Sequence, residues 1–269
     1  MPYTLVSFHA HPDDEALLTG GTLARAAAEG HRVVLAVATD GEAGAASTQY
    51  RSNLAAHRRD ELDRSADALG CARVVRFGFR DSGWSRTSAP APGAFSALPV
   101  MEAAAPLAEL LVEEKADALT IYDPAGGYGH PDHKQVHTVG IYAARLAATP
   151  LVLEATIDRT MIRRLIRLVE ALPGVLPAIH AADFADAYTA REHLTHRVDV
   201  RAYADAKRRA LEAHASQASS ESDSARTLAL LLKLPPWLFR RFLGHEWFVE
   251  RGRSPHRLDD DLFASLRQR

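Results

Sequence analysis

Two histidine-and-carboxylate turns stand out in the sequence, and the first spans residues 11–15, His-Pro-Asp-Asp-Glu. Imidazole and carboxylate together suit Zn²⁺, and a catalytic zinc needs only three protein ligands because water takes the fourth position. Two adjacent carboxylates can divide the work, one binding metal while the other serves as a base. A capped helix is the alternative interpretation, since Pro12 suits a helix start and Asp13 or Asp14 could cap it.

The second turn spans residues 130–133, His-Pro-Asp-His, and three glycines precede it at positions 126, 127 and 129. Glycines let the backbone pass close to a bound group. Both turns come after an apolar run and before a helical pattern, and the carboxyl ends of parallel strands meet at one edge of a sheet. Capping does not account for two such turns, so the sequence predicts a metal site there. His137 lies one helical turn after His133, but position 134 is a lysine where a helical zinc motif needs glutamate. We therefore assign His137 a supporting or packing role.

Other chemistries lack their signatures. The turn after the first apolar run carries no G-x-G-x-x-G for a dinucleotide, and the chain has no G-x-S-x-G nucleophile turn. The single cysteine, Cys71, can form neither an internal disulfide nor a thiolate metal site. A net charge of −2 without a long basic stripe disfavours nucleic acid as a partner.

Short apolar runs alternate with helical patterns over the first two-thirds of the 269 residues. This rhythm predicts a Rossmann-like α/β fold, a mostly parallel sheet with helices on both faces. The expected strands are Leu5–Phe8, Val33–Ala38, Arg73–Phe77, Ala118–Tyr122 and Leu151–Ile157. The expected helices are Glu15–Glu29, Arg51–Leu69, Met101–Glu114 and Asp132–Ala147.

The last third is less regular and predicts a smaller C-terminal α+β extension. We expect one domain of residues 1–269, with a core over about 1–158 and a C-terminal subdomain over about 159–269. Helices are expected over Met161–Leu172 and Tyr203–Ser216, and strands over Val198–Val200 and Glu246–Glu250. The first of these helices and segment 237–243 are basic and amphipathic, which fits a membrane surface or ordinary packing on a core; we favour packing. No stretch predicts membrane insertion, and the N-terminus lacks a basic segment with a following apolar run, so we expect a cytoplasmic protein.

Residues 11–15 and 129–133 together resemble the PIG-L/LmbE family of zinc N-deacetylases. The likeness extends over about residues 4–218, through the shorter stretches Gly20–Thr22, Thr39–Glu42, Arg58–Glu61, Asp81–Gly83 and Ala213–Gln217. It implies zinc ligands at His11, Asp14 and His133, with Asp13 as the general base.

The same resemblance implies that His130 stabilises the oxyanion or protonates the leaving amine, and that Tyr128 assists at the same oxygen. It implies substrate contacts from Arg58 and Asp81, and His214 is a further candidate that packing explains equally well. Hydrolysis of an amide fits these roles, because zinc brings the pKa of bound water to about 7 and the poor leaving amine needs a proton.

Several questions remain open from the sequence. The expected substrate is an N-acetylated amino sugar or a related small amide, with an N-acetylglucosaminyl-inositol, a thiol conjugate or an antibiotic sugar as alternatives. A non-catalytic, metal-stabilised binding protein is the alternative from another class. Two histidines and one aspartate also suit Fe²⁺, and a homo-oligomer is compatible with the sequence. The long loops 40–50 and 80–98 are expected to select the substrate, with Trp84 and Phe95 as an apolar wall or as loop anchors.

Overall fold

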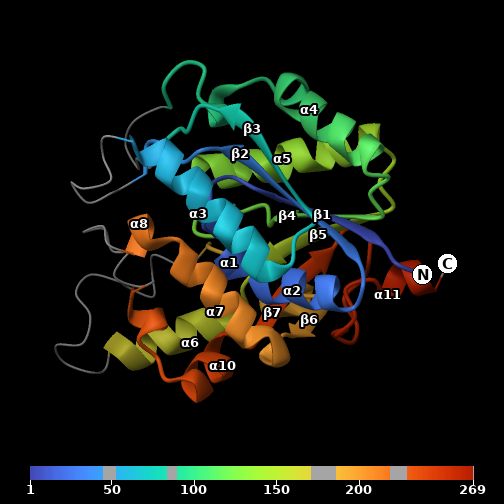
Figure 1. Cartoon of the computed structure of the whole chain (residues 1–269). Helices are drawn as coiled ribbons and strands as arrows, with labels where there is room; N and C mark the ends of the chain where they lie inside the picture. The colour runs from blue at the N-terminus through green and yellow to red at the C-terminus, as the bar shows by residue number, and fades with distance from the viewer. Residues whose placement is uncertain (45–52, 84–89, 171–185, 219–228, 269) are drawn as a thin grey trace.

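The computed structural model describes residues 1–44, 53–83, 90–170, 186–218 and 229–268. A seven-stranded sheet forms its centre, with helices packed on both faces (Figure 1). The strands are β1 (Thr4–His9), β2 (Arg32–Thr39), β3 (Arg73–Phe79), β4 (Ala118–Tyr122), β5 (Leu151–Thr156), β6 (His196–Asp199) and β7 (His245–Glu250). The helices are α1 (Asp14–Leu18), α2 (Gly20–Ala28), α3 (Leu54–Leu69), α4 (Val100–Glu113), α5 (Pro131–Leu146), α6 (Arg159–Glu170), α7 (Ala204–Ala213), α8 (Ala215–Ala218), α10 (Pro236–Leu243) and α11 (Ala264–Arg267).

The strand order is β3-β2-β1-β4-β5-β7-β6. The first five strands pair in parallel, which confirms the predicted parallel sheet, and β7 pairs antiparallel with both β5 and β6. The chain leaves β1 toward β2 on one side and later returns to β4 on the other. This reversal of direction is the place where open α/β sheets bind ligands, beyond the carboxyl ends of the strands.

Both faces of the sheet are buried, as continuous apolar strands require. Helices α4 and α5 cover one face, where Phe8 and Ile121 pack against Leu107 and Val136. Helices α1, α2, α3 and α7 lie on the opposite face (Figure 1). There, strand residues such as Leu5 pack in one cluster with side chains of α2 and α7.

The predicted helix 15–29 is wrong in one respect, because the chain forms two helices that meet at Thr19. The Thr19 hydroxyl donates to the Glu15 carbonyl at 3.0 Å, which ends α1. A new helix then starts at Gly20. A Cβ on the next residue, Gly21, would lie 2.5 Å from the side chain of Val200. The glycine thus lets α2 approach the C-terminal third closely.

The C-terminal third supplies β6 and β7 to the central sheet, and it also holds α2 in place. The buried Glu246 carboxylate accepts the N–H groups of Gly21 and Thr22 at 2.8 and 2.7 Å, at the start of α2. Lys207 of α7, also buried, donates to the same carboxylate at 2.6 Å. Negative charge at a helix N-terminus is stabilising.

Helix α6 lies where a basic helix is expected, and the end of that prediction, residues 171–172, lies outside the described residues. Helix α10 buries Phe239 but leaves Trp237 and Phe242 exposed, so core packing explains only part of its apolar surface. Within the described parts of the chain, every helix is too short or too polar to cross a membrane.

Candidate metal centre

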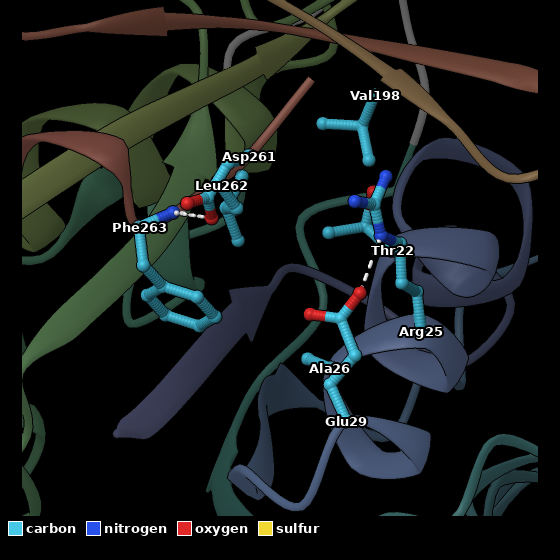
Figure 2. A pocket seen from close by; sticks show the side chains of 8 residues that line it. All are labelled: Thr22, Arg25, Ala26, Glu29, Val198, Asp261, Leu262 and Phe263. Atoms are coloured by element: carbon cyan, nitrogen blue, oxygen red, sulfur yellow. Dashed lines mark hydrogen bonds and ion pairs between the residues drawn. The ribbon is translucent and has the colours of Figure 1, made fainter. Parts of the chain in front are cut away.

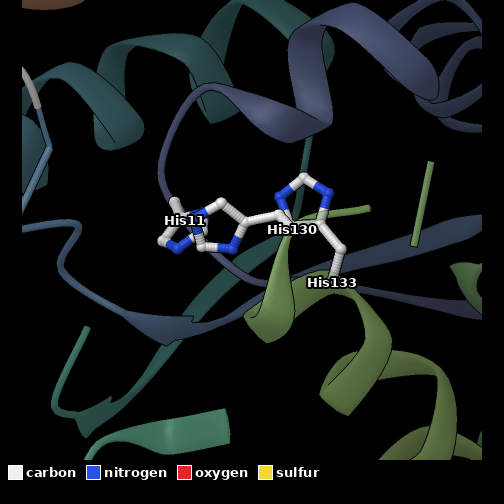
Figure 3. Close-up of side chains that lie close together, drawn as sticks. All are labelled: His11, His130 and His133. Atoms are coloured by element: carbon white, nitrogen blue, oxygen red, sulfur yellow. The ribbon is translucent and has the colours of Figure 1, made fainter. Parts of the chain in front are cut away.

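The two predicted turns meet at the switch point of the sheet. His11 follows β1, while His130 and His133 stand at the start of α5, just beyond β4 (Figure 3). The ring centroid of His11 lies 4.7 Å from that of His130 and 5.4 Å from that of His133. One ring nitrogen from each histidine lies within 4.8 Å of the others, and all three side chains are buried. The prediction that both turns share one edge of the sheet is confirmed.

Asp14 lies between two of these histidines. Its Oδ2 is 3.3 Å from Nδ1 of His11 and 3.3 Å from Nε2 of His133. Burial alone would raise the pKa of Asp14, but the neighbouring His133 and His11 hold that pKa well below its ordinary value. The carboxylate is therefore ionised, which is the form that binds a cation.

His133 gives the clearest sign that these side chains fit a metal. Its side chain is 1% exposed, Nδ1 has no hydrogen-bond partner among the described residues, and Nε2 faces the Asp14 carboxylate at 3.3 Å. Buried polar atoms nearly always find such a partner. Tyr122 stacks on the ring at 4.4 Å between centroids and fixes its plane. His11, Asp14 and His133 together offer two imidazoles and one carboxylate, the donor set of several catalytic metal sites.

A second cluster lies behind His11 and fixes its orientation. Nε2 of His11 donates to Oδ2 of Asp132 at 3.2 Å, and Asp81 Oδ1 is 3.5 Å from the same nitrogen. Ser82 donates its N–H to Asp132 at 3.0 Å. A carboxylate that accepts from one imidazole nitrogen leaves the other nitrogen as the free ligand atom. Asp132 therefore orients His11.

The His130 side chain caps α5. Its Nδ1 accepts the N–H of Asp132 at 3.1 Å. Burial, together with the adjacent His11 and His133, lowers the pKa of His130 to about 4. Because Nδ1 is an acceptor, the neutral ring carries its proton on Nε2 and is a hydrogen-bond donor there.

Asp13 has an unusual backbone, with φ at 112° and ψ at −30°. Burial and the charge of Asp14 raise the pKa of its carboxyl to about 6, against the opposing charge of Arg58. Asp13 Oδ2 lies 3.1 Å from Nη2 of Arg58. The side chain is 28% exposed and is a candidate base beside the metal ligands.

Three candidate substrate contacts are turned into the protein: Arg58 and Asp81, which the resemblance implies, and His214, for which packing was the equal alternative. Arg58 is 3% exposed and donates to the carbonyls of Gly41 and Pro12 at 2.6 and 2.7 Å. Asp81 accepts N–H groups from the loops at Ala43 and Gly83. His214 is fully buried on Glu15, which does not agree with a substrate contact.

Tyr128 stands at the mouth of the cluster. It is 47% exposed, and its ring lies 5.1 Å from the ring of His133 and 6.1 Å from that of His130. The loop that carries it is held by the buried Asp123, which accepts the N–H of Gly127 at 2.9 Å and the hydroxyl of Thr156. Sequence reasoning missed Asp123; its only signal is an acidic residue directly after a buried strand.

Two histidines outside the cluster, His9 and His137, make contacts within the protein. His9 is 1% exposed and contacts the hydroxyls of Ser7 and Tyr122 at 2.8 and 3.1 Å. His137 donates from Nδ1 to the Tyr122 carbonyl at 3.0 Å. Phe95 is fully buried against Phe8, so it anchors its loop, while Trp84 lies outside the described residues.

The family described as GlcNAc-PI de-N-acetylase (PIG-L) matches residues 6–144, which contain both turns. A 1D-myo-inositol 2-acetamido-2-deoxy-alpha-D-glucopyranoside deacetylase of Streptomyces griseus is 39% identical over 238 residues, covering 79% of this chain and 74% of that protein. The protein of the same name from Nocardia farcinica is 38% identical, covering 97% of this chain and 96% of its own. The chain belongs to the PIG-L family. The resemblance found in the sequence is thereby confirmed, and with it an amide-cleaving hydrolase of the N-deacetylase type.

Solved structures agree with PIG-L membership at the level of the fold. N,N'-diacetylchitobiose deacetylase from Pyrococcus horikoshii superposes with a TM-score of 0.61 at 19% identity, covering 92% of this chain and 83% of its own. A 4-carboxy-2-hydroxymuconate hydratase of Pseudomonas putida also superposes, with a TM-score of 0.56 at 14% identity, covering 96% of this chain and 100% of its own. The fold therefore carries more than one chemistry, and the reaction must be argued from the site.

A small hollow beside α2 shares no lining residue with the metal centre. It lies between α2, β6 and the segment before α11 (Figure 2). Its volume is about 10 Å³, enough for one water molecule. Its lining is Thr22, Arg25, Ala26, Glu29, Val198, Asp261, Leu262 and Phe263, none of which belongs to the metal centre.

Proposed function

We propose that this PIG-L protein is a zinc-dependent N-deacetylase of a small N-acetylated amino-sugar glycoside, with N-acetylglucosaminyl-inositol as the first candidate. The observation that carries the proposal is the arrangement around Asp14, where a carboxylate lies 3.3 Å from two buried histidines and directly follows a second carboxylate, Asp13. Metal ligands and a separate base are what the hydrolysis of an unactivated amide requires.

His11, Asp14 and His133 would hold the zinc ion. Zinc, when bound, polarises the amide carbonyl and lowers the pKa of the attacking water. Two histidines and one carboxylate leave a position open for these groups. The same donor set suits Fe²⁺, so the experiments below compare both metals.

Asp13 accepts a proton from the attacking water while the water oxygen bonds to the amide carbonyl carbon. Arg58 holds this carboxylate by a contact of 3.1 Å and orients it. The water oxygen and the carbonyl carbon form the new bond, the C–N bond then breaks, and the amine leaves with a proton while acetate remains. Asp13 carries that proton to the amine, since it has just received it.

His130 donates from Nε2 to the oxyanion that develops on the carbonyl oxygen. Its Nδ1 is occupied by the N–H of Asp132, which fixes both the tautomer and the direction of the ring. Tyr128, exposed at the mouth of the site, adds a second donor at the same oxygen. Donors held in place before the reaction stabilise such charge effectively.

The choice of substrate rests on the relatives. Two proteins that are 39% and 38% identical are named for deacetylation of a 2-acetamido-2-deoxy-glucopyranoside of inositol. The loops expected to select the substrate include residues 45–50 and 84–89, which lie outside the described residues. Thiol-conjugate amides and antibiotic sugars are therefore included in the test.

The test measures acetate release from a panel of N-acetylglucosaminides that includes the inositol glycoside and an N-acetylated antibiotic sugar, and amine release from a thiol-conjugate amide. Protein is assayed as purified, after removal of metal with a chelator, and after reloading with Zn²⁺ or Fe²⁺. Asp63→Asn is the matched control for Asp13→Ala, because Asp63 is an exposed carboxylate paired with an arginine, Arg76, on the outer side of α3. We expect activity that needs metal, survives in the control and is lost in Asp13→Ala.

Two results would redirect the proposal. Acetate-free turnover of a thiol conjugate would move the substrate class but keep the chemistry. Stoichiometric metal without hydrolysis of any N-acyl compound would favour a metal-stabilised binding protein instead.

A further inference from the structure

The backbone of Asp13 is held in a conformation that an aspartate rarely adopts. Its φ of 112° lies outside the regions that side-chain-bearing residues populate. Such a conformation persists only where surrounding contacts impose it. Arg58 contacts the carboxylate and the preceding carbonyl, so a separate group must hold the N–H of Asp13.

Glu15 is that group. Its Oε2 accepts the N–H of Asp13 at 2.9 Å. Its Oε1 accepts the hydroxyl of Ser65 at 2.5 Å and Nε2 of His214 at 2.7 Å. All three of these side chains are 0% exposed. One carboxylate thus joins the turn after β1 to α3 and to the end of α7.

These contacts exclude simpler roles for the three residues. The Glu15 carboxylate is occupied by donors on both oxygens, which leaves neither oxygen for a metal ion. His214 has no accessible surface, so it does not contact substrate. Its ring instead holds the Glu15 carboxylate through the 2.7 Å contact at Oε1.

We propose that Glu15, Ser65 and His214 are positioning residues that hold the backbone of Asp13 so that its carboxylate faces the attacking water. The proposal rests on the proposed function of Asp13 as the base. His214 brings the last third of the chain into the reaction, because it stands 199 positions from Glu15 in sequence. Removal of His214 or Ser65 leaves every metal ligand and the Asp13 carboxylate itself unaltered.

The expected effect is on turnover and not on binding. A misplacement of about 1 Å in a reacting group costs on the order of 100-fold in rate. We expect His214→Ala to lower kcat by at least about 10-fold, with KM and the metal content unchanged. His214→Gln retains an N–H at the same distance along the side chain and is expected to restore most of the rate. Ser65→Ala, which leaves one anchor on Glu15, is expected to have the smaller effect.

The matched control is Ser216→Ala. Ser216 is also 0% exposed, and it donates to Glu61 of the same helix α3 at 2.7 Å, so its loss removes a bond of the same kind. The two hydrogen bonds between Ser216 and Glu61 join α8 to α3. A general loosening of the protein would affect both serine variants alike.

The decisive readout is hydrogen exchange at the Asp13 amide in the metal-free protein, followed by NMR, together with kcat. It needs no substrate, so its result stands whether or not the deacetylase assignment does. The proposal predicts at least about tenfold faster exchange in His214→Ala, with wild-type exchange in Ser216→Ala. Unchanged exchange in His214→Ala, or equal acceleration in Ser216→Ala, would refute the anchor. Faster exchange with an unchanged kcat, in an enzyme that Asp13→Ala inactivates, would refute its role in the reaction.

Discussion

The strained backbone at Asp13 predicts that the proposed base destabilises the fold. Asp13→Gly and Asp13→Ala both remove the carboxylate and its 3.1 Å contact with Arg58, so they differ only in the side chain attached to a backbone at φ 112°. A residue with a Cβ in such a region costs about 1–3 kcal/mol. Relative to alanine, glycine lowers the free energy of unfolding by about 0.4–1 kcal/mol, because it gives the unfolded chain more conformational freedom.

The glycine variant should therefore be more stable than the alanine variant by about 1–2 kcal/mol. For a chain of this size that difference corresponds to roughly 2–8 °C in Tm. The assay is thermal and urea unfolding of both variants in excess chelator, because bound metal would add its own stabilisation. Equal stability of the two variants, or a more stable alanine variant, would show that the backbone at position 13 is not strained.

Three further predictions concern other parts of the structure. Lys207→Met leaves the buried Glu246 carboxylate without the ammonium group that lies 2.6 Å from it. Urea unfolding should show a free energy of unfolding lowered by about 3–5 kcal/mol, whereas a loss below about 1 kcal/mol would mean that the pair contributes as little as a surface ion pair. Gly41→Ala places a Cβ 2.1 Å from Nη1 of Arg58 at a φ of +67°; kcat should fall while the metal content stays constant, and a fully active variant would show that Arg58 need not hold this loop. Burial raises the pKa of the half-buried Cys71 thiol to about 12, so iodoacetamide at pH 8 should label Cys71 far more slowly in the native protein than in urea, and equal rates would contradict the raised pKa.

The sequence located the strands because each is a short apolar run between turn residues. The strands β1 to β5 lie within two residues of their predicted ends. Residues 11–15 and 130–133 each follow a parallel strand, so their meeting at the switch point was predictable from topology alone. Residue type then defined the chemistry of the metal centre.

Tertiary partners of buried polar groups were not predictable from one sequence. Glu246 caps a helix more than 200 positions away, and β7 pairs with β5 across nearly 100 residues. The resemblance indicated that Arg58 and His214 matter, but it could not indicate what each contacts. Both donate to groups of the turn after β1, where the sequence had led us to expect substrate.

The separation of metal ligand from base is the central claim, and one experiment tests it directly. Metal stoichiometry and acetate release are measured on the same preparations of Asp13→Asn and Asp14→Asn. We predict that Asp14→Asn loses both metal and activity, because Asp14 lies between His11 and His133, whereas Asp13→Asn retains metal and loses activity. An Asp13→Asn protein that releases acetate at the wild-type rate, or an Asp14→Asn protein that binds metal as the wild type does, would contradict the account.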